Sequence, residues 1–127
     1  LKIGISGYQS FEDPIVEDWV RESISNILRH FSPSAGITNL LGSTDRIFAE
    51  EILKINCPLN VIIPAEETFD WVNYKSLVIR AAKVEILCFS HPTERTYLEA
   101  IKAVVESADY LIFVGQEHLD FSQDLQR

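Results

Sequence analysis

Residues 2–31 read KIGISGYQSFEDPIVEDWVRESISNILRHF, and this stretch decides the fold class. Residues 2–6 form a short apolar run typical of a strand, which ends at Gly7. Asp13 suits a helix N-cap and Pro14 suits the first helical position. Apolar residues then recur every three or four positions, which predicts a helix with one buried face. We expect that face to comprise Val16, Trp19, Val20, Ile24, Ile27, Leu28 and Phe31.

The same alternation continues along the chain. Further strands are predicted at residues 36–41, 59–63, 84–89 and 110–114, and a helical pattern separates each from the next. Strands alternating with helices favour right-handed crossovers between parallel strands. We therefore predict an α/β fold, a Rossmann-like, doubly wound, mainly parallel five-stranded sheet with helices on both faces. Because residues 110–114 are apolar throughout, we expect the fifth strand in the middle of the sheet.

Size and composition limit the classes of function. The 127 residues suit a single domain, and the start at Leu1 without any methionine indicates a fragment or a chain truncated at its C-terminus. A net charge of −8 argues against general affinity for nucleic acid. No apolar run is long enough for a membrane span, and Cys57 and Cys88 lie in apolar surroundings typical of buried thiols. These features predict a cytoplasmic protein.

The loops after the first two strands carry the main candidate binding residues. Ser6, Gly7 and Tyr8 follow the first strand, where a glycine lets the backbone turn sharply or approach a ligand. Gly42 and Ser43 follow the second strand, directly before a helix whose first amides and dipole suit an anion. The candidates that continue into this helix are Thr44, suited to a phosphate, and Asp45, suited to a ribose hydroxyl. Alternatively, Ser43 or Thr44 only caps the helix.

Two later loops add weaker candidates. After the third strand, Glu66 and two further acids adjoin Phe69 and Trp71, so that a base could stack on an aromatic ring. The alternative is a solvated first helical turn with its aromatic rings in the core. His91 and Arg95 follow the fourth strand, but no second histidine or cysteine accompanies them, so we predict no metal site and no bound cofactor. Tyr74 and Tyr97 either reach the pocket or fill the core.

The order of these motifs resembles the SLOG superfamily. The segments that carry the resemblance are GISG at 4–7, GSTDRIFAE at 42–50, LNVIIPA at 59–65, YLE at 97–99 and SADYLIFV at 107–114. This superfamily includes LOG-type nucleotide phosphoribohydrolases, the DNA-processing protein A fold, and the sensor domains of melastatin-type TRP channels and of bacterial antiphage systems. The resemblance implies a Rossmann-like pocket for a nucleotide derivative, often ADP-ribose-like, in which Ser6 and Gly7 match one phosphate-side loop and residues 42–45 match another. The hydrolase branch carries P-G-G-x-G-T-x-x-E after its fifth strand, and residues 115–120 do not match it.

Three functions are consistent with these residues. The first is a sensor or regulatory domain that binds a nucleotide derivative and passes its state to an attached effector module or to another copy in a homo-oligomer. The second is a nucleoside 5′-monophosphate N-glycosidase, with Asp45 or Glu66 as the carboxylate. The third is a degenerate Rossmann scaffold that acts through protein contacts. No catalytic residue is assigned, because the glutamate-bearing loop of the hydrolase branch is missing.

Overall fold

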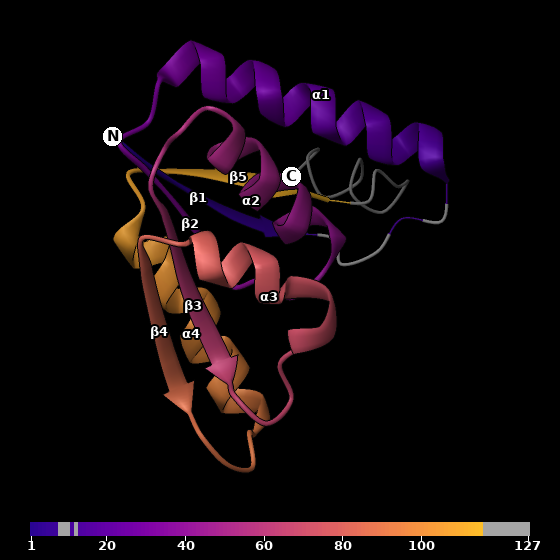
Figure 1. Cartoon of the computed structure of the whole chain (residues 1–127). Coiled ribbons are helices and arrows are strands. Elements are labelled where there is room, and N and C mark those ends of the chain that lie inside the picture. The colour runs from indigo at the N-terminus through magenta and orange to yellow at the C-terminus, as the bar shows by residue number, and fades with distance from the viewer. Residues whose placement is uncertain (8–10, 12, 116–127) are drawn as a thin grey trace, which may run out of the picture.

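A computed structural model describes residues 1–7, 11 and 13–115, in which strands and helices alternate (Figure 1). The strands are β1 (Lys2–Gly7), β2 (Ala35–Thr38), β3 (Leu59–Ala65), β4 (Lys83–Cys88) and β5 (Tyr110–Val114). The helices are α1 (Pro14–Phe31), α2 (Ser43–Lys54), α3 (Trp71–Arg80) and α4 (Glu94–Ser107). Each predicted element is present, although β2 ends at Thr38 and not at Leu41.

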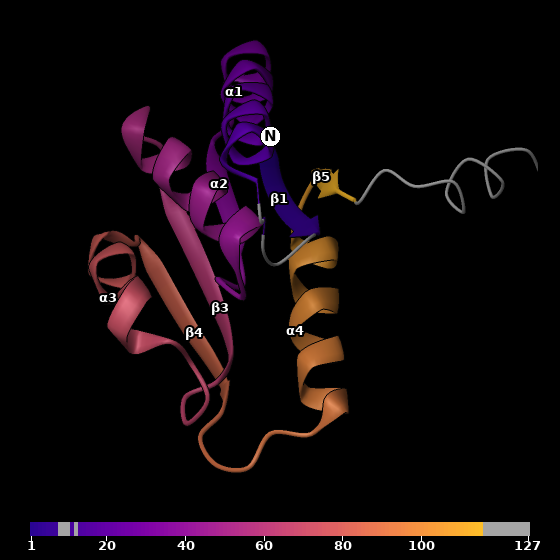
Figure 2. The ribbon, with the colours of Figure 1, turned by 90° about the vertical axis from the view of Figure 1, so that its right-hand side faces the viewer.

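All five strands are parallel, in the order β4-β3-β2-β1-β5. Helices α1, α2 and α3 lie on one face of the sheet, and α4 lies on the other (Figure 2). The change of face follows from the topology, because α4 carries the chain from β4 back across the sheet to the far side of β1. The α/β, Rossmann-like, doubly wound prediction with helices on both faces is confirmed.

The predicted position of the fifth strand is wrong. β5 is an edge strand that pairs only with β1 among the described residues. Its Ile112 is buried in the core, whereas Phe113 is 67% exposed and Leu111 is 36% exposed. The apolar run was expected to indicate a strand covered on both faces, but the reversal of strand order after β4 places this run at the edge instead.

Helix α1 begins as the sequence predicts. The Asp13 carboxylate accepts a hydrogen bond from the Ile15 amide at 2.9 Å, and Pro14 takes the first helical position. Val20, Ile24 and Leu28 form the buried stripe, spaced by four residues. The prediction is wrong for Val16 and Trp19, which are 42% and 67% exposed. Successive helical residues differ by about 100° in direction, so Trp19 cannot share the direction of Val20.

Helix α2 packs very closely on β2. A Cβ added at Gly36 would lie 2.6 Å from Cδ1 of Ile52 and 3.1 Å from the ring of Phe48. Both of these side chains are fully buried. The absence of a side chain at residue 36 therefore brings the α2 backbone, and with it the loop that precedes α2, down onto the sheet.

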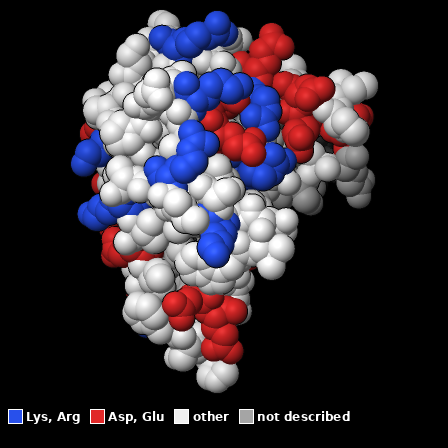
Figure 3. Space-filling view, in the orientation of Figure 1, with Lys and Arg blue, Asp and Glu red and all other residues white. Residues whose placement is uncertain are grey.

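The face that carries α1 and α2 holds charges of both signs (Figure 3). Arg21 of α1 contacts Glu50 at 2.6 Å and the buried Glu51 at 2.9 Å, both on α2. Arg46 of α2 contacts Glu17 of α1 at 3.1 Å. These cations pair with carboxylates of the neighbouring helix and so hold α1 against α2.

Neither cysteine is in a disulfide. Cys57 is buried, as expected, and Cys88 at the end of β4 is half-buried. Within the described ranges, no helix has the length and apolar character needed to cross a membrane.

Candidate functional site

A cavity of about 250 Å³ lies beyond the carboxyl ends of β2 and β3. Four segments form its walls: the loop after β2, the end of β3 with the following loop, the first turns of α3, and the start of α4. The lining residues are Leu40, Leu41, Pro64, Ala65, Thr68, Phe69, Asp70, Tyr74 and Tyr97. The position agrees with the general rule that ligands of such sheets bind beyond the strand ends. It is nevertheless separated from the reversal of strand order, which falls between β1 and β5.

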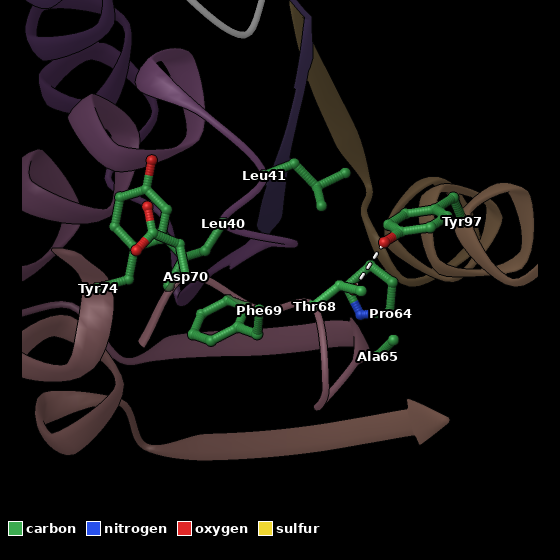
Figure 4. Close-up of a pocket in the computed structure, with 9 residues that line it drawn as sticks. All are labelled: Leu40, Leu41, Pro64, Ala65, Thr68, Phe69, Asp70, Tyr74 and Tyr97. Atoms are coloured by element: carbon green, nitrogen blue, oxygen red, sulfur yellow. Dashed lines mark hydrogen bonds between the residues drawn. The ribbon is translucent and has the colours of Figure 1, made fainter. Parts of the chain in front are cut away.

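The polar groups of the cavity lie at its two ends (Figure 4). Asp70 and Tyr74 lie together at one end, and Tyr97 lies at the other with Thr68 beside it. The hydroxyls of Thr68 and Tyr97 are 2.7 Å apart, and this hydrogen bond joins the loop after β3 to α4. The ring of Phe69 lies between the two ends. The cavity therefore offers an apolar middle with a polar group at each end.

Asp70 lines one end of the cavity and also caps α3. It is the N-cap of α3, and one carboxylate oxygen accepts from the Asn73 amide at 3.1 Å. The other oxygen accepts from the side-chain amide of Asn73 at 2.8 Å. Burial raises the pKa of the neighbouring Tyr74, and the negative charges of Asp70 and Asp45 raise it further against the opposite effect of Arg46. Asp70 gives this end of the cavity its carboxylate, and the Asp70 side chain is exposed to solvent.

The loop after β2 is held rigidly by buried side chains. Leu40 has a left-handed backbone (φ 54°), which is rare for a bulky residue, and its amide donates to the Thr38 hydroxyl at 3.1 Å. The side-chain amide of Asn39 donates to the carbonyls of Ile62 on β3 at 2.7 Å and of Ala100 on α4 at 3.2 Å. These bonds fix Leu40, and with it one wall of the cavity, against both β3 and α4.

Asp45 closes the same loop. Its carboxylate accepts from the Leu41 amide at 2.8 Å, and its side chain is buried. Burial raises the pKa of Asp45 from its ordinary value of 3.8 to about 6, although the hydrogen bond from Leu41 opposes the rise. The predicted contact of Asp45 with a ribose stays a prediction. In the structure its carboxylate holds the loop, and it does not line the cavity.

The raised pKa of Asp45 gives the first testable prediction. The folded chain holds the Asp45 proton more tightly than the unfolded chain, so ionisation costs stability as pH rises from about 4 through about 6. In Asp45→Asn the amide oxygen can still accept from Leu41, but no charge is buried. We expect the stability of this variant relative to the native chain to increase by up to about 3 kcal/mol between pH 4 and pH 7.5. Urea unfolding at a series of pH values measures this difference, and a flat difference would contradict a buried, ionising Asp45.

The other predicted residues of this helix lie beside the cavity. Gly42 is the N-cap of α2, with extended backbone, and it follows directly on the lining residue Leu41. The capping alternative made Ser43 or Thr44 the N-cap. It is wrong, because both residues belong to the first helical turn. Ser43 is half-buried and Thr44 is buried.

The predicted residues of the first loop are placed apart from the cavity lining. Ser6 and Gly7 end β1 and pair with Phe113 and Val114 of β5. Gly7 has φ 147°, and a Cβ there would lie 2.2 Å from the Val114 carbonyl oxygen. The structure therefore gives Gly7 a packing function against β5. Tyr8 lies outside the described residues.

Glu66 is exposed and is absent from the cavity lining. Its carbonyl accepts from the indole of Trp71 at 3.2 Å, and its amide continues the pairing of β3 with β4 through Cys88. Phe69, named with Glu66 as a candidate for stacking, does line the cavity. Tyr74 and Tyr97, which the sequence left open, both line it.

The residues that sequence reasoning missed are mainly those without an obvious chemical function. They are Leu40, Leu41, Pro64, Ala65 and Thr68. Because the second strand was predicted to run to Leu41, the rule that ligands lie beyond the strand ends pointed to residues from 42 onward and to 64–68, and it does not say which side chains turn inward. His91 and Arg95 do not line the cavity. His91 lies 4.0 Å from Glu67, and Arg95 pairs with Glu99 at 3.4 Å.

Among the described residues, no group of three or more His, Cys, Asp or Glu side chains could hold a metal ion. No protein-family model matches the chain, and no curated protein matches it. The function is therefore argued from the residues of the cavity and the loops around it.

Proposed function

We propose that this chain is a sensor or regulatory domain that binds a nucleotide derivative, ADP-ribose-like in type, in the cavity beyond β2 and β3. The observation that carries the proposal is the lining of that cavity, which combines the Phe69 ring with the Asp70 carboxylate and the hydroxyls of Tyr74 and Tyr97. Small-molecule sites are typically apolar clefts with a few well-placed polar groups, often beyond the ends of parallel strands. The resemblance to the SLOG superfamily supports the same class of ligand.

The parts of such a ligand find suitable surroundings. A base packs against Phe69 between the two polar ends, and ribose or amino donors meet Asp70 or the hydroxyls. The remainder of the ligand leaves the cavity past Leu41 toward Gly42 and Ser43. There the first amides of α2 and the half-buried Ser43 hydroxyl are the nearest predicted phosphate contacts.

Hydrolysis of a nucleotide finds less support in the geometry. The carboxylates considered for an N-glycosidase were Asp45 and Glu66, and neither lines the cavity. Asp70 does line it, but both of its oxygens already accept from Asn73 and fix the start of α3. A carboxylate held in this way suits binding better than attack on a sugar carbon.

A thermal-shift experiment tests the proposed binding. The chain is heated with adenosine, AMP, NAD, cyclic ADP-ribose and ADP-ribose. A ligand present at 100 times its Kd stabilises the fold by about 2.7 kcal/mol, which raises Tm by roughly 10 °C. In Thr68→Trp the indole fills the cavity from an exposed loop position, and we expect the shift to disappear.

Glu67→Trp is the matched control, because Glu67 is exposed, precedes Thr68 and does not line the cavity. This variant is expected to keep the shift. A shift that survives in Thr68→Trp would place the ligand elsewhere. If none of the five compounds raises Tm, the proposal fails and the protein-contact scaffold is the better explanation.

A further inference from the structure

Resting on the proposed function, we infer that the cavity admits only the uncharged nucleoside end of its ligand and keeps phosphate groups outside. A free nucleoside should accordingly bind at least as tightly as its 5′-monophosphate. The inference depends on three features of the cavity: its charge, its hydrogen-bonding groups and its size.

The charge of the cavity opposes an anion. None of the nine residues that line it is Lys, Arg or His, and Asp70 contributes a carboxylate. Behind the wall, Asp45 is bonded to the amide of the lining residue Leu41, and its charge acts on Tyr74 against the opposite effect of Arg46. On the face drawn in Figure 3, Lys and Arg lie among Asp and Glu around α1 and α2, and acidic residues mark the end at which β3 and β4 terminate. The exposed Arg95, near the start of α4, already pairs with Glu99. Phosphate sites usually draw on cations, and the nine lining residues contribute none.

The hydrogen-bonding groups of the cavity suit a ligand that donates. Each oxygen of an ionised carboxylate has two lone pairs, so each Asp70 oxygen keeps one after accepting from Asn73. At the opposite end, Thr68 and Tyr97 share one hydrogen bond, after which both hydroxyls keep capacity to accept and one of them keeps its O–H as a donor. A nucleoside carries donors at both ends, in its sugar hydroxyls and in the amino or imino groups of its base.

The size of the cavity limits how much of the ligand enters. Its volume of about 250 Å³ is below the roughly 300–1,000 Å³ of most small-molecule sites. A nucleoside-sized group fits such a space, whereas a dinucleotide or a complete ADP-ribose does not. The phosphates must then lie beyond the mouth, where water screens their repulsion by Asp70.

Affinities for matched pairs of compounds test this inference. Calorimetric titration is carried out with adenosine and AMP, guanosine and GMP, cytidine and CMP, uridine and UMP, and with ADP-ribose. In the pair that binds best, we expect the nucleoside to have a Kd equal to or lower than that of the monophosphate. Raising salt from about 50 to 300 mM should improve monophosphate binding and leave nucleoside binding unchanged, because salt screens repulsion. A cationic phosphate site would lose affinity with salt.

Asp70→Asn tests the residue that the inference depends on. Asparagine is as good an N-cap as aspartate, so α3 should keep its start. We expect nucleoside affinity to fall about tenfold, because a charged acceptor is lost. Monophosphate affinity should fall less, because repulsion is lost as well. Glu66→Gln removes the same charge from the same loop but from outside the cavity, and it should change neither affinity.

The outcomes separate this inference from the proposed function. A monophosphate or ADP-ribose that binds more tightly than every nucleoside overturns the inference and leaves the proposed function standing. Binding of none of these compounds overturns both. Equal effects of Asp70→Asn and Glu66→Gln would show that general charge, and not the cavity carboxylate, sets the preference, which also overturns the inference.

Discussion

Replacing Phe48 with alanine is expected to lower the free energy of unfolding by about 4 kcal/mol. Phe48 is fully buried on α2, where its ring lies against Gly36 of β2. Removal of a buried phenyl ring costs the transfer of that ring and leaves a cavity that the neighbours fill only in part. Urea unfolding followed by circular dichroism measures the change. Leu40 and Leu41 line the cavity in the loop directly before α2, so the same variant should lower the affinity of any ligand bound there.

Trp19→Ala is the matched control for this prediction. Tryptophan is larger than phenylalanine, but Trp19 is 67% exposed on α1. We expect a change within about 0.5 kcal/mol, as is usual for surface positions. A cost for Trp19→Ala that approaches that of Phe48→Ala would mean that another surface covers this side of α1.

The sequence predicts most of the fold because local patterns and topology agree. Asp13 and Pro14 mark the start of α1, and the spacing of its apolar residues marks its length. Alternation of strands and helices then restricts the sheet to parallel crossovers of one hand. The pattern does not reveal strand order, and for that reason the apolar run 110–114 was expected in the middle of the sheet and not at its edge.

The candidate site is less accessible to sequence reasoning, because its shape depends on contacts between distant segments. The bond between Thr68 and Tyr97 joins residues 29 positions apart. Asn39 reaches across to Ala100, 61 positions away. The left-handed backbone of Leu40 has no glycine to signal it. The rule that ligands lie beyond strand ends indicates the edge of the sheet at which the cavity lies, whereas the inward turn of particular side chains follows from how β3, α3 and α4 pack.

Gly7→Val is expected to lower the free energy of unfolding by about 4 kcal/mol. The backbone of Gly7 has φ 147°, which side-chain-bearing residues rarely adopt, and a Cβ would lie 2.2 Å from the carbonyl oxygen of Val114. Strained backbone costs about 1–3 kcal/mol, and overpacking against a neighbour costs about as much again. The clash is with backbone, so β5 must move away from β1 to relieve it. Thermal and urea unfolding measure the loss, and Gly7→Ala should show a smaller loss of the same kind.

Ser6→Ala provides the comparison for Gly7, because Ser6 is the neighbouring residue of β1 and pairs with Phe113 of β5. It should change stability by no more than about 0.5 kcal/mol. If Gly7→Val were equally harmless, the close pairing of β1 with β5 would be wrong.

The stability of the Gly7 variants also decides how their ligand-binding data are interpreted. Loss of ligand binding in a Gly7 variant reports the displacement of β5 before it reports any phosphate contact. Gly42 has extended backbone at φ −174°, which any residue adopts, so a Gly42 variant that stays folded and loses binding reports on the ligand itself.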